Sequence, residues 1–277
     1  MKLNNLLQRA IFTAVLAGKE IIKIYDSKFQ VDYKNDKSPL TTADKNANKI
    51  IESNLKSLNI PILSEEGKFI SYKQRKSWKY FWLIDPLDGT KEFINRNGEF
   101  TVNIALIDKN KPILGVVYVP VSKLLYFGTK DIGSHKIDLS LLQENFDILK
   151  SDVITLTSMS NKLPIFKSRD IYTVVGSRSH MSIETEIFLK EKKDLHDDIK
   201  VLSVGSSLKL CMVAEGKADI YPRYAPTMEW DTAAGHAVLS AAGGNVLQVE
   251  DKQPLKYGKP NYKNPFFIAS SKNVKLI

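Results

Sequence analysis

The strongest constraint in this sequence is a polar turn that directly follows an apolar run. Residues Tyr80 to Ile84 are all aromatic or aliphatic, and the next six residues read Asp85-Pro-Leu-Asp-Gly-Thr. An apolar run of this kind is typical of a strand that is buried on both faces. We therefore expect Asp85 to lie where the chain leaves the core. A carboxylate in that position is costly unless a positive group pairs with it.

The proline and the glycine of this segment predict a turn. The turn would bring Asp88 back near Asp85 and direct the Leu87 carbonyl toward the same space. Oxygen ligands of this kind suit a magnesium-like ion. Gly89 and the start of a short helix, which we expect over Thr90–Ile94, offer backbone N–H groups that bind anions. The segment therefore predicts a site for a divalent metal ion and a phosphate group.

Two further acidic clusters strengthen this interpretation, because two aspartates alone could merely cap a turn. Glu65 and Glu66 follow another short apolar run. Neighbouring residues on a strand face opposite ways, so we expect only Glu65 to enter the site. Asp231 lies near the start of the alanine-rich segment 229–242, which predicts a buried helix. From the residues alone, Asp231 could instead serve only as a cap of that helix.

These motifs resemble those of a known superfamily. Ser64-Glu-Glu, Asp85-Pro-Leu-Asp-Gly-Thr and Trp230-Asp-Thr-Ala-Ala-Gly are similar to the motifs of the lithium-sensitive, magnesium-dependent sugar phosphatases, which include inositol monophosphatases and fructose bisphosphatases. A closer resemblance, to bacterial 3′(2′),5′-bisphosphate nucleotidases of the CysQ type, covers nearly the whole chain and is carried by segments 85–107, 112–118, 205–209 and 221–223. Inositol monophosphatases share the Asp-Pro-x-Asp-Gly-Thr core but lack the Lys-Glu-Phe-Ile-x-Arg-Asn-Gly-Glu-Phe continuation.

The resemblance implies a site with two or three Mg²⁺ ions and assigns a role to each residue. The implied metal ligands are Glu65, Asp85, the Leu87 carbonyl, Asp88 and Asp231, with Asp85 bridging two ions. The implied catalytic residues, which position the attacking water, are Glu65, Thr90 and Asp44. The implied contacts to the scissile phosphate and its surroundings are Leu87, Asp88, Asp231 and the backbone N–H groups of Gly89 and Thr90.

The second half of the chain is expected to select the substrate. The resemblance implies that contacts to adenosine and to a second phosphate come from His180, Ser207, Lys209 and Arg223. Lysine and arginine beside a metal centre suit a substrate with two separated phosphates. From the residues alone, His180 and Ser207 could instead cap helices, and the two basic residues could be ordinary surface charges.

Composition agrees with an enzyme of this kind but does not select it. The chain has 277 residues, 43% of them hydrophobic, and a net charge of +9. Such a charge can indicate a nucleic acid or membrane partner, but the lysines are scattered, so we expect a solvated basic surface and no nucleic acid partner. Cys211 is the sole cysteine, which excludes internal disulfides and cysteine metal clusters. The sequence has no P-loop and no nucleophile elbow, which favours metal-activated water over a covalent intermediate.

The order of apolar segments predicts an α/β (α+β) protein. The resemblance sharpens this to the layered α/β/α/β/α sugar-phosphatase fold, as a single inositol monophosphatase-like unit over residues 1–277. Its subdomains would be roughly 1–130, with the metal and phosphate core, and 131–277, with the nucleotide-selecting part and Asp231. Residues 6–25 predict an amphipathic helix, and a second helix should run from about 43 to 58 with Thr41 or Thr42 as its cap. Strands are expected at 60–64, 79–84, 100–108, 112–119, 123–127, 171–175 and 200–204, with the third to fifth as a meander.

Three functions are open. The leading one is magnesium-dependent removal of the 3′-phosphate from adenosine 3′,5′-bisphosphate (PAP) to leave AMP, with the sulfated nucleotide PAPS as a further substrate and a link to sulfate assimilation. The alternatives are an inositol monophosphatase or other small sugar-phosphate phosphatase, and a non-catalytic nucleotide- or RNA-binding protein. No apolar segment is long enough for a membrane span or fits a signal peptide. We therefore expect a cytoplasmic protein, with weak peripheral association at the inner membrane as the alternative. The sequence does not predict the oligomeric state.

Overall fold

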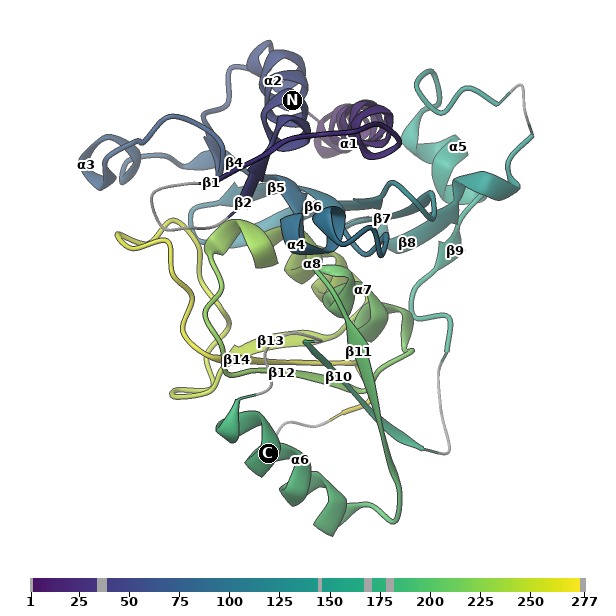
Figure 1. The fold of residues 1–277 in the computed structure, drawn as a ribbon, viewed down its shortest axis with the longest axis vertical. Coiled ribbons are helices and arrows are strands. Elements are labelled where there is room, and N and C mark those ends of the chain that lie inside the picture. The colour runs from purple at the N-terminus through teal and green to yellow at the C-terminus, as the bar shows by residue number, and fades with distance from the viewer. Residues whose placement is uncertain (1, 34–38, 144–145, 167–170, 178–181, 275–277) are drawn as a thin grey trace.

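The computed structural model describes residues 2–33, 39–143, 146–166, 171–177 and 182–274 (Figure 1). His180, one of the expected nucleotide contacts, lies outside the described residues. No helix in the described ranges is both long enough and apolar enough to cross a membrane.

Helices and sheets alternate in layers through the molecule (Figure 1). Helices α1 (Leu3–Tyr25) and α2 (Thr42–Lys56) cover one face of a seven-stranded sheet. Helices α7 (Leu208–Glu215) and α8 (Glu229–Ala241) lie between this sheet and a five-stranded sheet, whose far face carries α6 (Ile183–Leu195). The expected α/β class and the α/β/α/β/α layering are therefore confirmed.

The two sheets divide the chain in sequence order. The seven-stranded sheet consists, in spatial order, of β3 (Ile62–Ser64), β4 (Tyr80–Asp88), β5 (Thr101–Asp108), β6 (Lys111–Val119), β7 (Leu124–Thr129), β8 (Gly133–Asp138) and β9 (Asn161–Lys162). The five-stranded sheet consists of β11 (Ile199–Val204), β10 (Tyr172–Ser177), β12 (Ile220–Arg223), β14 (Phe267–Ser270) and β13 (Asn245–Gln248). The smaller elements are β1 (Val31–Tyr33), β2 (Pro39–Thr41), α3 (Tyr72–Arg75), α4 (Thr90–Ile94), α5 (Val153–Ser158) and the 3₁₀ turn Leu139–Leu141.

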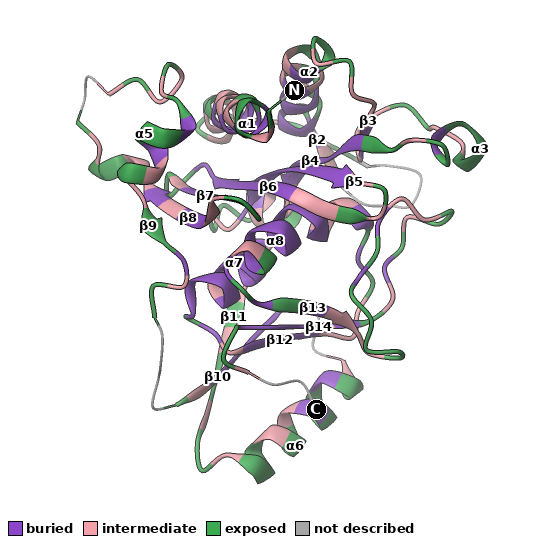
Figure 2. Cartoon of the chain, turned by 180° about the vertical axis from the view of Figure 1, so that it is seen from behind, coloured by how far each residue is buried: buried purple, intermediate pink, exposed green. Residues whose placement is uncertain are grey.

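Strand β4 is buried on both faces, as its apolar sequence predicts. Trp82 and Ile84 pack into the core beneath α1 and α2, whereas Phe81 and Leu83 pack into the second core, toward α7 and α8. Figure 2 shows that β4 is buried along most of its length. Each such side chain contributes about 1.5–3 kcal/mol through the removal of apolar surface from water. The expected meander is also confirmed, because β5, β6 and β7 are successive antiparallel neighbours.

Two features of the first sheet differ from the sequence-based expectations. Strand β4 does not end at Ile84: it continues to Asp88, with a register shift between Asp85 and Asp88. A bulge accommodates the missing N–H of Pro86, so Asp85 is a buried strand residue instead of the point at which the chain leaves the core. Residues 133–138 and 161–162, where no strand is expected from sequence, form β8 and β9, so the first sheet extends past residue 130.

Capping explains where α2 begins. The hydroxyl of Thr41 accepts the N–H of Ala43 at 3.1 Å, and Asp44 accepts the N–H of Thr41 at 2.7 Å. This reciprocal arrangement is a capping box. Thr41 is therefore the cap, and the same contacts fix the side chain of Asp44.

Helix α8 packs unusually close to the first sheet because glycine lies opposite it. A Cβ atom on Gly115 of β6 would lie 2.3 Å from the Ala234 carbonyl oxygen and 2.7 Å from the Ala237 Cβ. Neither atom belongs to a flexible side chain. The start of α8, which carries Asp231, is thus set against the sheet that carries Asp85.

We expect Gly115→Ala to lower the free energy of unfolding by about 1–3 kcal/mol, because the added methyl group overpacks this contact. Gly176→Ala is the matched control, since a Cβ at Gly176 would meet no described atom within 4 Å. Thermal or urea unfolding of both variants checks the prediction. Equal stability of the two variants would contradict the close packing of α8 on β6.

A second prediction concerns His236, which is buried inside α8 with its Nδ1 2.8 Å from the Tyr257 hydroxyl. Burial lowers the pKa of His236 to about 4, against about 6.5 in an unfolded chain. Between these values the unfolded chain binds a proton that the native protein does not, so stability falls as pH falls from about 6.5 toward 4, by up to about 1.4 kcal/mol per pH unit. We expect His236→Asn to lose this part of the pH dependence in unfolding experiments. If the free energy of unfolding changed with pH in parallel for the wild type and the variant, the prediction would be contradicted.

Candidate functional site

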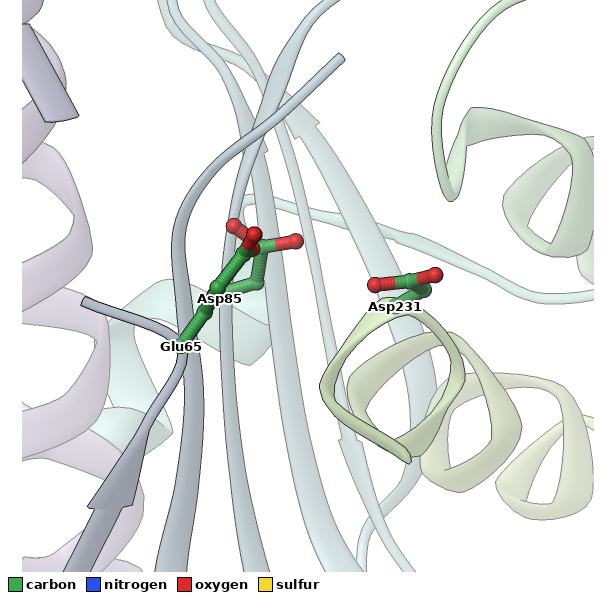
Figure 3. Close-up of side chains that lie close together, drawn as sticks. All are labelled: Glu65, Asp85 and Asp231. Carbon is green, nitrogen blue, oxygen red and sulfur yellow. The ribbon is translucent and has the colours of Figure 1, made fainter. Parts of the chain in front are cut away.

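Three carboxylates from separate elements converge where the start of α8 lies against the seven-stranded sheet. Glu65 follows β3, Asp85 lies in β4 and Asp231 lies in the first turn of α8 (Figure 3). One carboxylate oxygen from each lies within 4.8 Å of the others. Glu65 is thus the member of the Glu65–Glu66 pair whose carboxylate belongs to this cluster. We call these three residues the acid cluster.

The acid cluster is electrostatically unfavourable without a cation. Burial raises the pKa of Asp85 well above its usual value, and the charges of Glu65, Asp88 and Asp231 raise it further. Burial and the charges of Asp88 and Glu65 likewise raise the pKa of Asp231. The donors are all hard carboxylate oxygens, which fit a divalent ion such as Mg²⁺. The residues present therefore fit the metal that the sequence motifs imply.

Asp88 lies beside the acid cluster and is held by two donors. Its Oδ2 atom accepts the N–H of Ser207 at 2.6 Å and the side-chain amide of Asn103 at 3.3 Å. Burial raises the pKa of Asp88 to about 6, although the nearby charge of Lys209 opposes the rise. These contacts join the first half of the chain to the start of α7.

Thr90 and Asp44 form a direct contact at the edge of the same site. The Thr90 hydroxyl lies 3.2 Å from Asp44 Oδ1 and 3.5 Å from the Leu87 carbonyl oxygen. The other oxygen of Asp44 accepts the N–H of Thr41 at 2.7 Å. The capping box of α2 therefore fixes Asp44, and Asp44 in turn fixes Thr90.

Gly89 connects β4 to α4 in a conformation that other residues rarely adopt. Its φ is +94°, in the left-handed region. A Cβ there would also lie 3.3 Å from the Glu99 carbonyl oxygen. The glycine of the motif is thus required for the turn that follows Asp88.

A pocket adjoins the acid cluster on the side of the second sheet. Its walls include Asp88 and Asp231 together with Ser207, Lys209 and Arg223. The structure thus brings three of the four expected nucleotide contacts to one pocket.

The side chains of Ser207 and Lys209 have roles that the sequence did not specify. Ser207 makes no side-chain capping bond; its hydroxyl lies 2.8 Å from Asn103 Oδ1 and 2.9 Å from Thr101 Oγ1. Lys209 is buried, and its ammonium group donates to the carbonyl of Ser206 at 2.6 Å. Burial lowers the pKa of Lys209 to about 8. Ser207 thus occupies the N-cap position of α7 without capping the helix through its side chain, and Lys209 is not an ordinary surface charge.

Sequence reasoning did not select Thr101 and Asn103, which support Asp88 and Ser207. A signal was present, because they are polar residues at alternate positions of an otherwise apolar strand and so share one face. Reasoning from the sequence also did not select Glu92 and Glu99. Glu99 accepts the N–H of Gly205 at 2.8 Å, and a Cβ on Gly205 would lie 2.6 Å from Glu92 Cγ.

Comparison with known proteins agrees with this geometry. A model described as the inositol monophosphatase family matches residues 2–275. The chain is 43% identical over 259 residues to the 3′(2′),5′-bisphosphate nucleotidase CysQ of Shigella flexneri, covering 92% of this chain and 95% of the relative.

Solved structures show the same fold. CysQ from Bacteroides thetaiotaomicron, a bacterial member of the inositol monophosphatase family, matches with a TM-score of 0.89 and 45% identity, covering 98% of both chains. The extragenic suppressor protein SuhB from Bartonella henselae, at 23% identity, matches in fold with a TM-score of 0.72, covering 97% of this chain and 94% of that one. Together with the match of the family model over residues 2–275, these similarities show that the chain belongs to the inositol monophosphatase family.

Proposed function

We propose that this protein is a 3′(2′),5′-bisphosphate nucleotidase, a phosphoric monoester hydrolase that converts PAP to AMP and phosphate. The observation that carries the proposal is the acid cluster with an adjoining pocket that contains Lys209 and Arg223. The CysQ proteins of 43% and 45% identity support the same substrate class. Activity on PAPS, a role in sulfate assimilation, sensitivity to lithium and a cytoplasmic location belong to the proposal as its finer parts.

The proposed cofactor is Mg²⁺, with two or three ions held by Glu65, Asp85, Asp88, Asp231 and the Leu87 carbonyl. When bound, such ions lower the pKa of a water molecule and neutralise charge on the attacking and leaving oxygens. The chain's own contribution is to hold these oxygen ligands together in spite of their mutual repulsion.

Thr90, Asp44 and Glu65 are proposed to orient the attacking water. The Thr90 hydroxyl can donate a hydrogen bond to Asp44. The Thr90 oxygen then remains available to accept a hydrogen bond from the water. Backbone N–H groups of Gly89 and Thr90 are proposed to bind the phosphate that is removed. Water, phosphate and ligands would then be aligned before reaction, which lowers the barrier through orientation.

Arg223 is the proposed contact for the second phosphate. Its Nη2 donates to the Pro226 carbonyl at 3.1 Å, which orients the guanidinium on the pocket wall. Lys209 adds positive potential from a buried position, and it holds the turn that contains Ser207. His180 completes the proposed nucleotide set. The whole chain is proposed to act as one catalytic unit, with its two subdomains meeting at the site.

We expect the purified protein with Mg²⁺ to release phosphate from PAP in strong preference to inositol 1-phosphate at equal concentration. Asp88→Asn should lower the rate at least about 100-fold, because even residues that only support metal ligands change activity by 10–100-fold. Measurement of released phosphate checks both points.

The controls separate the metal mechanism from the substrate assignment. Arg223→Met should lower the preference for PAP while phosphate release from inositol 1-phosphate is unchanged. A wild-type preference for the inositol ester would keep the metal mechanism and overturn the nucleotide assignment. Tight nucleotide binding without phosphate release from either ester would favour the non-catalytic alternative.

Mg²⁺ should stabilise the fold, because the ion relieves repulsion within the acid cluster and binds the native state. At 100 times the dissociation constant the gain is about 2.7 kcal/mol. We expect Glu65→Gln to lose most of the Mg²⁺-dependent rise in melting temperature, whereas Glu66→Gln, the matched control, retains it. A melt of the wild type that saturating Mg²⁺ leaves unchanged would count against the metal site.

A further inference from the structure

The carboxylate of Asp231 is held by the backbone just before its helix. Asp231 Oδ2 accepts the N–H of Met228 at 2.9 Å. Met228 is an exposed residue, and it provides no side-chain cap for α8. The direction of the Asp231 carboxylate therefore depends on whatever fixes the Met228 peptide.

Asn264 contacts the peptides on both sides of Met228 from a distant part of the chain. Its side-chain amide donates to the Met228 carbonyl at 2.7 Å, to Thr232 Oγ1 at 3.0 Å and to Thr227 Oγ1 at 3.2 Å. The Asn264 N–H also donates to the Thr227 carbonyl at 2.8 Å. Asn264 is only 4% exposed. It thus lies across the first turn of α8 and contacts both sides of Asp231 in sequence.

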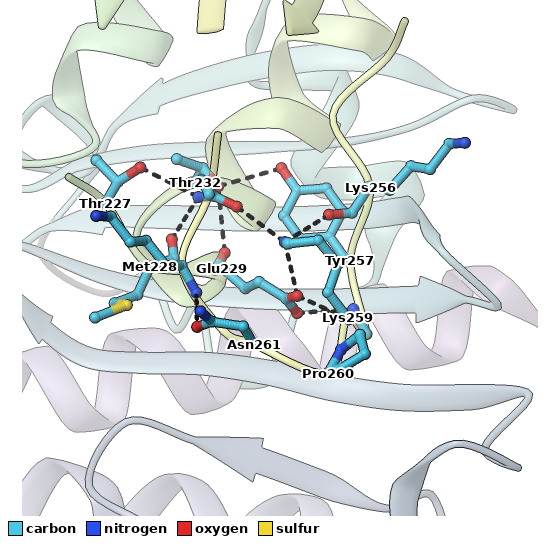
Figure 4. A network of polar contacts seen from close by, with 12 residues as sticks. Thr227, Met228, Glu229, Thr232, Lys256, Tyr257, Lys259, Pro260 and Asn261 are labelled. Atoms are coloured by element: carbon cyan, nitrogen blue, oxygen red, sulfur yellow. Dashed lines mark hydrogen bonds and ion pairs between the residues drawn. The ribbon is translucent and has the colours of Figure 1, made fainter. Parts of the chain in front are cut away.

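Glu229 ties the same turn to the loop that precedes Asn264 (Figure 4). Its fully buried carboxylate accepts the N–H of Gly258 at 2.7 Å, the N–H of Lys259 at 2.9 Å and the Lys259 ammonium group at 2.7 Å. The same ammonium group donates to Asn264 Oδ1 at 3.2 Å. A continuous chain of contacts therefore runs from Lys259 through Asn264 and Met228 to Asp231.

The spacing of the two acids along α8 gives them different partners. Residues two positions apart on a helix lie about 200° apart around its axis. Asp231 consequently lies on the side of Glu65 and Asp85, while Glu229 lies on the side of the loop 256–264 (Figures 3 and 4). A buried ion pair such as Glu229–Lys259 is often no more stabilising than apolar residues of similar size. Because Glu229 of this pair lies in the same helical turn as Asp231, we interpret the pair as a contact that orients this turn.

We propose that Asn264 is a positioning residue for Asp231, and that Glu229 and Lys259 hold Asn264 in place. This inference rests on the proposed function, because it takes Asp231 as a metal ligand. The loop 256–264 would thus set the geometry of the metal site without contacting the metal or the substrate. Supports of this kind typically change metal affinity by 10–100-fold when they are removed.

The test is direct metal binding to the full chain, measured as loss of the electron paramagnetic resonance signal of free Mn²⁺. Asp231→Asn identifies which Mn²⁺ site depends on Asp231. We expect Asn264→Ala to weaken that site by about 10–100-fold. Asn261→Ala is the matched control, since Asn261 lies in the same loop but is exposed, and its Oδ1 accepts the N–H of Lys263 at 3.0 Å. This control should bind Mn²⁺ as the wild type does.

Melting curves without metal separate positioning from simple stabilisation. A lower melting temperature for Asn264→Ala with wild-type Mn²⁺ affinity would overturn the proposal. If Asn264→Ala does not fold, Lys259→Met decides, because it removes the outer donor of the chain of contacts and should weaken Mn²⁺ binding several-fold. Wild-type affinity in Lys259→Met would then overturn the proposal. Absence of Mn²⁺ binding by the wild type would instead refute the metal site itself, and this inference with it.

Discussion

Repulsion between closely spaced carboxylates is the constraint on which this structure depends. Glu65, Asp85 and Asp231 approach within 4.8 Å, and Asp88 lies beside them, although burial and neighbouring negative charges raise the pKa of Asp85 and Asp231. Such a cluster is held only if each backbone position is independently fixed. The fold does this by placing two acids in the seven-stranded sheet, after β3 and in the bulged strand β4, and the third at the start of α8 in the adjoining helical layer.

The local parts of this arrangement could be predicted from sequence. The apolar run before Asp85, the glycine after Asp88 and the alternation around Glu65 are short-range signals, and the structure places these residues together. The bulge in β4 was not predicted, because Pro86 reads equally well as a turn residue or as a strand residue at an irregularity. Strand β8 was also missed, since its place in the sheet depends on pairing with β7 and not on its own apolar pattern.

The supporting residues are harder to find because their partners are distant in sequence. Ser207 supports Asp88 across 119 positions, and Asn264 reaches Met228 across 36. Neither serine nor asparagine carries a pattern that indicates such a partner. Lys209 illustrates the same limit: a lysine in sequence suggests a surface charge or a phosphate contact, whereas its burial and its bonds to backbone carbonyls become visible only in the folded chain.

Two long-range contacts link the segment that follows the Asp-Pro-x-Asp-Gly-Thr core to the second half of the chain. The continuation after the Asp-Pro-x-Asp-Gly-Thr core contains Glu92 and Glu99, which lie against Gly205. Gly205 begins the turn that places Ser207 next to Asp88 and Lys209 in the wall of the pocket. The continuation in the first half of the chain therefore packs against a turn of the second half that forms part of the pocket wall. Glu92 lines the same pocket, so the packing at Gly205 couples the two halves at the site itself.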